Sequence, residues 1–362
     1  MSGESRAGVA FAPGRVNLIG EHIDYHGLPV LPMALRRGVR VEFQRRFDRR
    51  IRAVSAGYGE REFEWTEDLT PVAAGDWENY LRAAARVAFP FCERPMGIDA
   101  EITSDLPAAA GLSSSTALLV AFTLGLLRAN GYNPGFEDLM QVLPDGEQFV
   151  GTRGGGMDHA ASLGSRAGCA SLVSFAPVEV RHIPIPPDWG FWIADSGVKA
   201  EKSGAAREKY NARRKGGTAA LERLGLTSYA AARVEDAARL TNAEEHDAFL
   251  HTVTERDRVT AAVAAMQSGD LAEFGRAMLA SHQSLRDRLH VSCAALDNLV
   301  ERAMRAGAAG ARLTGAGFGG CVVICGARAV EDALCAAIPG LMQAVAGDGA
   351  LEHAAWKGGM AG

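Results

Sequence analysis

Side chains that could bind a hydroxyl-rich ligand gather near the start of the chain, between Pro13 and Tyr25 (PGRVNLIGEHIDY). The charged or ionisable residues that stand out in this segment are Arg15, Glu21, His22 and Asp24. Carboxylates accept hydrogen bonds from several hydroxyls at once, and a histidine can donate or accept. The segment therefore predicts a site for a polyhydroxylated molecule, although a solvated loop with a local salt bridge would have the same composition.

A run of small residues, Leu106 to Thr116 (LPAAAGLSSST), precedes an apolar stretch that is typical of a buried helix. The first N–H groups of a helix lack partners and its dipole is positive there, so a phosphate can bind. Ser113, Ser114 and Ser115 add hydroxyls that could reach phosphate or Mg²⁺. No lysine follows the glycine, so this is not a Walker motif. Taken alone, the segment also fits an ordinary serine N-cap on a core helix.

Two further glycine-rich segments complete the set, Gly151 to His159 (GTRGGGMDH) and Thr314 to Gly320 (TGAGFGG). The second suits a loop pressed against a ligand, and a tight turn would look the same. Phosphoryl transfer needs positioning, charge neutralisation and often a carboxylate that accepts the hydroxyl proton. Asp158 is the natural base and Arg15 the natural cation. The first motif, the serine-rich segment and the loop 314–320 together predict a nucleotide and a polar co-substrate in one cleft.

The elements that must position these residues follow from hydrophobic periodicity. We expect strands around 39–43, 51–54, 98–102, 169–175, 191–194 and 321–325. We expect helices over 113–128, 204–224, 228–239, 246–267, 270–288 and 293–306. A proline-rich break, 183–188 (IPIPPD), predicts two domains, 1–183 and 184–362. This order of elements favours an α+β chain over a regularly alternating parallel fold.

Composition narrows the class of protein. The chain of 362 residues is 48% hydrophobic and 22% charged, with a formal charge of −5, which is ordinary for a globular protein and argues against a nucleic-acid partner. The uncharged stretch 106–127 is interrupted by a proline, a glycine and serines, so we expect a buried helix and no membrane span. Six cysteines without metal-binding spacing and a start without a signal-peptide core favour the cytoplasm. No signal for self-association stands out, and we expect a monomer.

At this point the sequence resembles the GHMP small-molecule kinases, and its first motif resembles the galactokinase signature almost letter for letter. The resemblance continues through 195–199 (DSGVK), 210–214 (YNARR), 281–287 (SHQSLRD), 291–293 (VSC) and the final glycine loop. It implies the GHMP kinase fold: an N-terminal domain of the ribosomal-S5-like type with a mixed sheet, and a helix-rich α+β C-terminal domain. It also implies transfer of the γ-phosphate of MgATP to the anomeric C1 hydroxyl of galactose.

The resemblance assigns roles at the matching positions. Arg15 and Asp158 would be the catalytic pair. Glu21, His22, Asp24 and Tyr210 would bind the sugar, with backbone contacts from Gly155 and Gly156. The nucleotide would bind at Ala109, Ala110, Gly111, Leu112, Ser113, Ser114 and Ser115. Ser114 and Glu147 would hold Mg²⁺, and the third loop, Gly315 to Gly320, would close over the nucleotide.

Several departures leave alternatives open. Alanines 108–110 replace the usual glycines, and the strings GGGMD and MDH replace the usual forms around the catalytic acid. These features and Glu147 resemble the N-acetylgalactosamine kinase branch, so the C2 substituent of the sugar stays open. A catalytically inactive sugar and ATP sensor, or a GHMP kinase for another substrate, is a further alternative. The full-length loop 111–117 with Arg15 and Asp158 favours an enzyme. His159 could tune Asp158, touch the substrate or only pack beside it.

Overall fold

A five-stranded mixed sheet forms the first layer in the computed structural model, which describes residues 6–107, 111–151, 154–198 and 205–353. Its strands are β1 (Ala7–Ile19), β2 (Leu31–Arg45), β3 (Arg50–Ser55), β4 (Gly59–Glu64) and β5 (Ile98–Ser104), in the order β1-β2-β5-β3-β4. The β3–β5 pair is parallel and the other pairs are antiparallel. Long β1 and β2 pair from Ala7 opposite Gln44 to Ile19 opposite Leu31.

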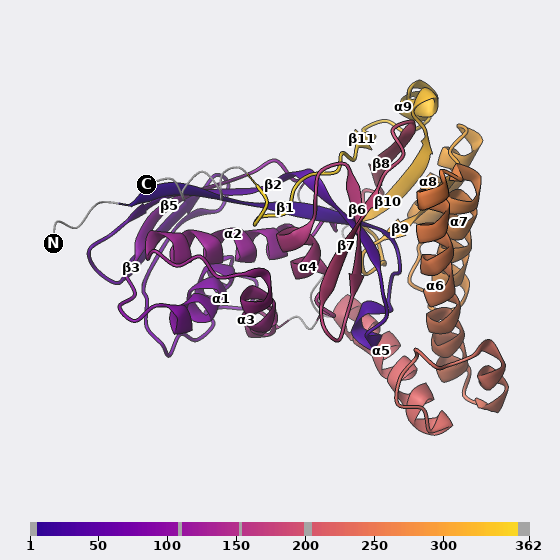
Figure 1. The fold of residues 1–362 in the computed structure, drawn as a ribbon, viewed down its shortest axis with the longest axis horizontal. Helices are drawn as coiled ribbons and strands as arrows, with labels where there is room; N and C mark the ends of the chain where they lie inside the picture. Colours follow the sequence, from indigo (N-terminus) through magenta and orange to yellow (C-terminus); the bar gives the residue numbers. More distant parts are fainter. Residues whose placement is uncertain (1–5, 108–110, 152–153, 199–204, 354–362) are drawn as a thin grey trace.

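Helices cover one face of this sheet (Figure 1). They are α1 (Glu78–Ala88), α2 (Ser114–Ala129), α3 (Phe136–Phe149) and the short α4 (Met157–Gly164). Helix α2 is buried on nearly every side because it packs between β1, β2 and α1. The opposite face of the sheet is solvated, as the alternation of buried Val39, Val41 and Phe43 with exposed Arg40 and Glu42 shows.

A second sheet and a group of long helices form the other end of the molecule. A hairpin of β6 (Cys169–Ser174) and β7 (Glu179–Pro184) leads into β8 (Trp189–Asp195). The sheet order is β11-β8-β10-β9, with β9 (Gly310–Thr314), β10 (Cys321–Ala327) and β11 (Met342–Gln343). The helices are α5 (Ala205–Leu224), α6 (Ala243–Ser268), α7 (Leu271–Asp287), α8 (Ala294–Arg305) and α9 (Glu331–Ala337). Helices α6 and α7 pack side by side (Figure 1), and α7 and α8 both pack on β9.

Most predicted elements are confirmed, including the α+β class, the buried helix after the serines and the long helices of the second half. The helix predicted over 228–239 is wrong: only a 3₁₀ segment, η3 (Val234–Arg239), forms there. The guanidinium of Arg256 donates to the carbonyl oxygens of Tyr229 and Ala232, at 2.8 and 2.9 Å, so side-chain bonds replace helical ones. No helix in the described part of the chain has the length and hydropathy needed to cross a bilayer.

The first half of the first motif is a strand, because β1 runs from Ala7 to Ile19 and includes Pro13 and Arg15. The chain then turns at Gly20 and forms a single 3₁₀ turn, η1 (Asp24–His26). The division at residues 183 and 184 stays a prediction. The C-terminal segment does return to the first sheet, where the N–H of Gly347 donates to the carbonyl oxygen of Ala34 at 2.9 Å.

Candidate active site

Arg15 and Asp158 meet although 143 positions separate them. Arg15 lies in β1 and Asp158 lies in the first turn of α4, with Nε 2.6 Å from Oδ1. Arg15 also donates to the carbonyl oxygen of Gly111 at 3.0 Å, and the hydroxyl of Ser113 donates to Asp158 Oδ2 at 2.6 Å. Burial lowers the pKa of Arg15, but the carboxylates of Asp158 and Glu21 outweigh it and raise that pKa above its usual value. The predicted catalytic pair is therefore a charged, tightly held unit.

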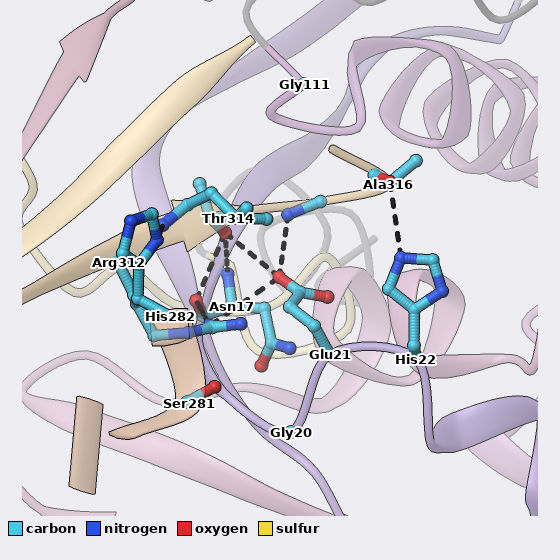
Figure 2. Close-up of polar contacts among 12 residues, drawn as sticks. Asn17, Gly20, Glu21, His22, Gly111, Ser281, His282, Arg312, Thr314 and Ala316 are labelled. Carbon is cyan, nitrogen blue, oxygen red and sulfur yellow. Dashed lines mark hydrogen bonds and ion pairs between the residues drawn. The ribbon is translucent and has the colours of Figure 1, made fainter. Parts of the chain in front are cut away.

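Glu21 is held by the glycine-rich loop between β9 and β10 (Figure 2). The N–H of Gly315 donates to Oε1 at 2.6 Å, and the hydroxyl of Thr314 lies 3.3 Å from the same atom. The fully buried guanidinium of Arg312 lies 3.7 Å away. Burial raises the pKa of Glu21, and Arg312 and Arg15 oppose that shift. Oε1 of Glu21 is thus held by the protein itself before any ligand binds.

Sequence reasoning missed Arg312 and the second carboxylate behind this site, Glu255 of α6. Glu255 Oε1 accepts from the N–H of Gly20 at 2.9 Å and from the hydroxyl of Ser281 at 2.6 Å. Burial alone would raise the pKa of Glu255, but Arg258 and His251 hold it at about 2. The signal for Arg312 was a single charged residue in a short strand, Gly310–Thr314, that the structure buries completely.

His22 connects the first motif to the glycine-rich loop. Its Nε2 lies 3.2 Å from the carbonyl oxygen of Ala316, and its Nδ1 lies 3.0 Å from the hydroxyl of Tyr25. Burial lowers the pKa of His22 to about 3, so the ring is neutral. Because a carbonyl only accepts, Nε2 carries the proton and Tyr25 donates to Nδ1. Both ring nitrogens thus have protein partners, and sugar binding through them stays a prediction.

Tyr210 of α5 completes this wall of the site. Its ring centroid lies 5.2 Å from that of His22 and 5.7 Å from that of Tyr25, the latter edge-on. Arg214, one helical turn later, lies over Tyr25 with 5.9 Å from Cζ to the ring centroid. The packing brings α5 against the first motif, as the prediction for Tyr210 requires.

Asp24 faces the glycines that precede α4. The N–H of Gly155 donates to Asp24 Oδ2 at 3.1 Å. Burial raises the pKa of Asp24 to about 7, and the negative charges of Asp158 and Glu21 add to the shift. Gly156 adopts φ 97°, a left-handed conformation that favours glycine, at the N-cap of α4.

Replacing Gly155 by alanine should disturb this carboxylate. A Cβ at position 155 would lie 2.5 Å from Asp24 Oδ2, so the two groups cannot keep their places. A shift of about 1 Å at a reacting centre costs up to about 100-fold, and we expect kcat/KM for the sugar to fall roughly 10-fold to 100-fold. Gly135→Ala is the matched control, since its Cβ would meet nothing closer than 3.7 Å. If steady-state kinetics give Gly155→Ala and Gly135→Ala the same kcat/KM for the sugar, this account of Asp24 is contradicted.

The raised pKa of Asp24 predicts a pH effect on the ligand-free protein. The folded protein binds a proton at Asp24 up to about pH 7, whereas the unfolded chain releases it near 3.8. Asp24 therefore costs stability as the pH rises through that window, and the cost is complete above about 7. Compared with wild type, Asp24→Asn should gain a few degrees in melting temperature between pH 5 and pH 8. If the difference in melting temperature between Asp24→Asn and wild type stays constant from pH 5 to pH 8, the raised pKa of Asp24 is contradicted.

The predicted phosphate loop is only partly described, because Ala109 and Ala110 lie outside the described residues. Gly111 has φ 71° and lines the cavity together with Ser115. Leu112 and Ser113 are buried behind it, and Ser114 is exposed at the first residue of α2. The hydroxyl of Ser113 donates to Asp158, so Ser113 lies beside the predicted catalytic pair.

Glu147 of α3 lies on the same side of the cavity. Its Oε1 accepts from the hydroxyl of Thr116 at 2.8 Å, a partner that sequence reasoning missed. No group of three or more His, Cys, Asp or Glu side chains with metal-binding geometry occurs among the described residues. One carboxylate with neighbouring hydroxyls is the donor set with which Mg²⁺ binds when phosphates and water fill its other positions.

One cavity of about 990 Å³ unites these groups. Arg15, Glu21, Asp24 and Asp158 line it together with Gly111, Ser115 and Glu147. Ligand pockets usually measure roughly 300–1,000 Å³, so the volume suits two ligands side by side. The arrangement places the contact between Arg15 and Asp158 between a carboxylate-rich side of the cavity and the start of a helix.

Comparison with known proteins shows to which family the chain belongs. The galactokinase galactose-binding signature matches residues 2–52, and the N-terminal and C-terminal domains of GHMP kinases match residues 79–166 and 262–340. Galactokinase of Chloroflexus aurantiacus is 36% identical over 340 residues, which cover 91% of this chain and 86% of that protein. The chain belongs to the galactokinase family.

Other galactokinases and solved structures agree with this assignment. Galactokinase of a Roseiflexus species is 36% identical over 322 residues, covering 86% of this chain and 81% of the relative. The structure of Lactococcus lactis galactokinase complexed with galactose superposes with a TM-score of 0.87 at 27% identity, covering 95% of this chain and 94% of the other. Mevalonate kinase of Methanococcus jannaschii, 18% identical with a TM-score of 0.69 over 96% of this chain and 99% of the other, shares the fold.

Proposed function

We propose that this member of the galactokinase family transfers the γ-phosphoryl group of ATP to the anomeric C1 hydroxyl of galactose, giving galactose 1-phosphate and ADP. The observation that carries the proposal is the Arg15–Asp158 contact of 2.6 Å inside a cavity that Glu21 and Asp24 line. A carboxylate held by an arginine beside two further carboxylates suits a sugar hydroxyl that must lose a proton as it attacks phosphorus.

The proposed step is a single displacement. The C1 oxygen forms a bond to the γ-phosphorus while the bond from that phosphorus to the oxygen bridging it to the β-phosphate breaks, and ADP leaves with the electron pair. The C1 hydroxyl proton passes to the carboxylate of Asp158. Arg15, which already donates to Asp158, stabilises the charge on the transferred group. No covalent intermediate with the protein is required.

The remaining polar groups hold the two substrates. The sugar hydroxyls are bound by Glu21, His22, Asp24 and Tyr210 and by the backbone of Gly155 and Gly156. Because the backbone and Arg312 fix Oε1 of Glu21, its second oxygen is oriented before the sugar arrives. The nucleotide phosphates lie along the loop 109–115, which covers Ala109, Ala110, Gly111, Leu112, Ser113, Ser114 and Ser115.

Ser114 and Glu147 would hold the Mg²⁺ that accompanies ATP. Bound Mg²⁺ neutralises phosphate charge and withdraws electron density from the transferred group. Glu147 fits this role because it is a cavity-lining carboxylate with a hydroxyl neighbour. We also propose a monomer in the cytoplasm, where ATP is available, and the six free cysteines are consistent with a reducing compartment.

A coupled ADP-release assay across galactose, N-acetylgalactosamine, glucose and talose tests the function. We expect the highest kcat/KM with galactose and a phosphate ester at C1 in the phosphorus NMR spectrum of the product. ATP turnover that no sugar stimulates, or a higher kcat/KM with N-acetylgalactosamine, would contradict the proposal.

A further inference from the structure

His159 of α4 is a buried polar side chain without a hydrogen-bond partner. The residue is 1% exposed and lines the cavity, and neither Nδ1 nor Nε2 makes a hydrogen bond. A neutral imidazole carries one donor and one acceptor, and leaving them unsatisfied in the interior is costly. Such a side chain beside a ligand cavity indicates a partner that is engaged when the cavity is filled.

The polar group facing His159 is the carboxylate of Glu147. His159 Nε2 lies 3.7 Å from Glu147 Oε1, which is beyond hydrogen-bond distance. That oxygen already accepts from the hydroxyl of Thr116 at 2.8 Å, so Oε1 points toward α2 and α4. Oε2 lies on the side of Gly154, where a Cβ would come within 3.1 Å of it. The two oxygens of Glu147 thus have different surroundings.

We propose that His159 is a positioning residue for Glu147, donating from Nε2 to Oε1 so that Oε2 is directed at the divalent cation of the nucleotide. The inference rests on the proposed function, in which Glu147 holds that cation. An approach of roughly 0.7 Å converts the present contact into an ordinary hydrogen bond. Carboxylates that bind metals are typically oriented by hydrogen bonds of this kind, whose loss costs about 10-fold to 100-fold in metal affinity.

The neighbouring carboxylate, Asp158, is not the one that His159 positions. Its oxygens accept from Arg15 and Ser113 at 2.6 Å each, so the catalytic carboxylate is held by its own donors. His159 is therefore expected to act on the cation and not on the proton acceptor. A change at position 159 should alter metal dependence before it alters the chemistry at saturating metal.

The test measures Mn²⁺ binding to the full chain with a non-hydrolysable ATP analogue, followed through the electron paramagnetic resonance signal of free Mn²⁺. We expect His159→Leu to weaken the Mn²⁺ affinity about 10-fold, and His159→Gln to stay within roughly threefold of wild type because its amide can donate to Oε1. His246→Leu, outside the cavity, is the matched control and should change nothing. At saturating Mg²⁺, kcat of His159→Leu should stay near wild type while the Mg²⁺ needed for half-activation rises.

A double-mutant cycle with Glu147→Gln decides whether the effect passes through Glu147. The double variant should bind Mn²⁺ no more weakly than Glu147→Gln alone. Unchanged affinity in His159→Leu, fully additive losses, or nitrogen couplings that show the imidazole bound to Mn²⁺ would each overturn the proposal. If leucine prevents folding, His159→Asn, which is too short to reach Oε1, carries the same expectation. The two proposals can fail separately. If wild type phosphorylates the sugar normally but the His159 variants keep the wild-type Mn²⁺ affinity, the role of His159 is refuted and the proposed function stands.

Discussion

Replacing Asp158 by asparagine should lower kcat for galactose by roughly 1,000-fold, since a positioned general base contributes typically 10²–10⁴-fold. The amide keeps the size of the side chain but cannot take the C1 proton. It also leaves Arg15 without its charged partner, because Arg15 Nε lies 2.6 Å from Asp158 Oδ1. Nucleotide affinity should change little, because no phosphate-binding role is assigned to this carboxylate.

Steady-state kinetics with calorimetric titration of an ATP analogue separate the two effects. Asp145→Asn is the matched control, since Asp145 is exposed on α3 and does not line the cavity. If Asp158→Asn phosphorylates galactose at nearly the wild-type rate, the proton must go elsewhere.

Replacing Asp24 by alanine should raise KM for galactose roughly 10-fold to 100-fold, because a hydrogen bond to a charged group is worth about 1.5–3 kcal/mol. Asp24 Oδ2 accepts from the N–H of Gly155, which fixes the carboxylate at the cavity wall. Loss of its acceptors should leave sugar hydroxyls unpaired while ATP binds as before.

The measurement is KM for galactose and for ATP in the same preparation. Asp68→Ala, an exposed aspartate outside the cavity, serves as control. An unchanged KM for galactose would remove Asp24 from the sugar site.

The sequence allowed the separate parts of the site to be predicted better than their assembly. Residue types in the first motif indicated hydroxyl binding, and small residues before an apolar helix indicated a phosphate loop. The contact between Arg15 and Asp158 could not follow from spacing alone, since it arises where β1 passes the start of α4. Residue chemistry identified Asp158 as a base and Arg15 as a cation, and the family resemblance made them the catalytic pair.

The fold was predictable where periodicity was strong and not where side chains satisfy the backbone. Buried α2 and the long helices α6 and α7 follow from their apolar patterns. The segment 228–239 has helix-forming residues, yet it is not a regular helix, because the Arg256 guanidinium donates hydrogen bonds to its carbonyl oxygens. The role of Arg312 was not predicted, because the sequence of its strand does not indicate that the arginine is buried against Glu21 in the turn after β1.

The central claim is that the phosphoryl group passes from ATP to galactose within one cavity. A crystal structure of the full chain with galactose and a non-hydrolysable ATP analogue tests it most directly. The account predicts both ligands in the cavity of about 990 Å³, with the anomeric hydroxyl beside Asp158 and facing the terminal phosphorus. Reacting atoms in such an arrangement lie roughly 3–3.5 Å apart. Sugar and nucleotide in separate cavities, or a C1 hydroxyl turned away from Asp158, would contradict it.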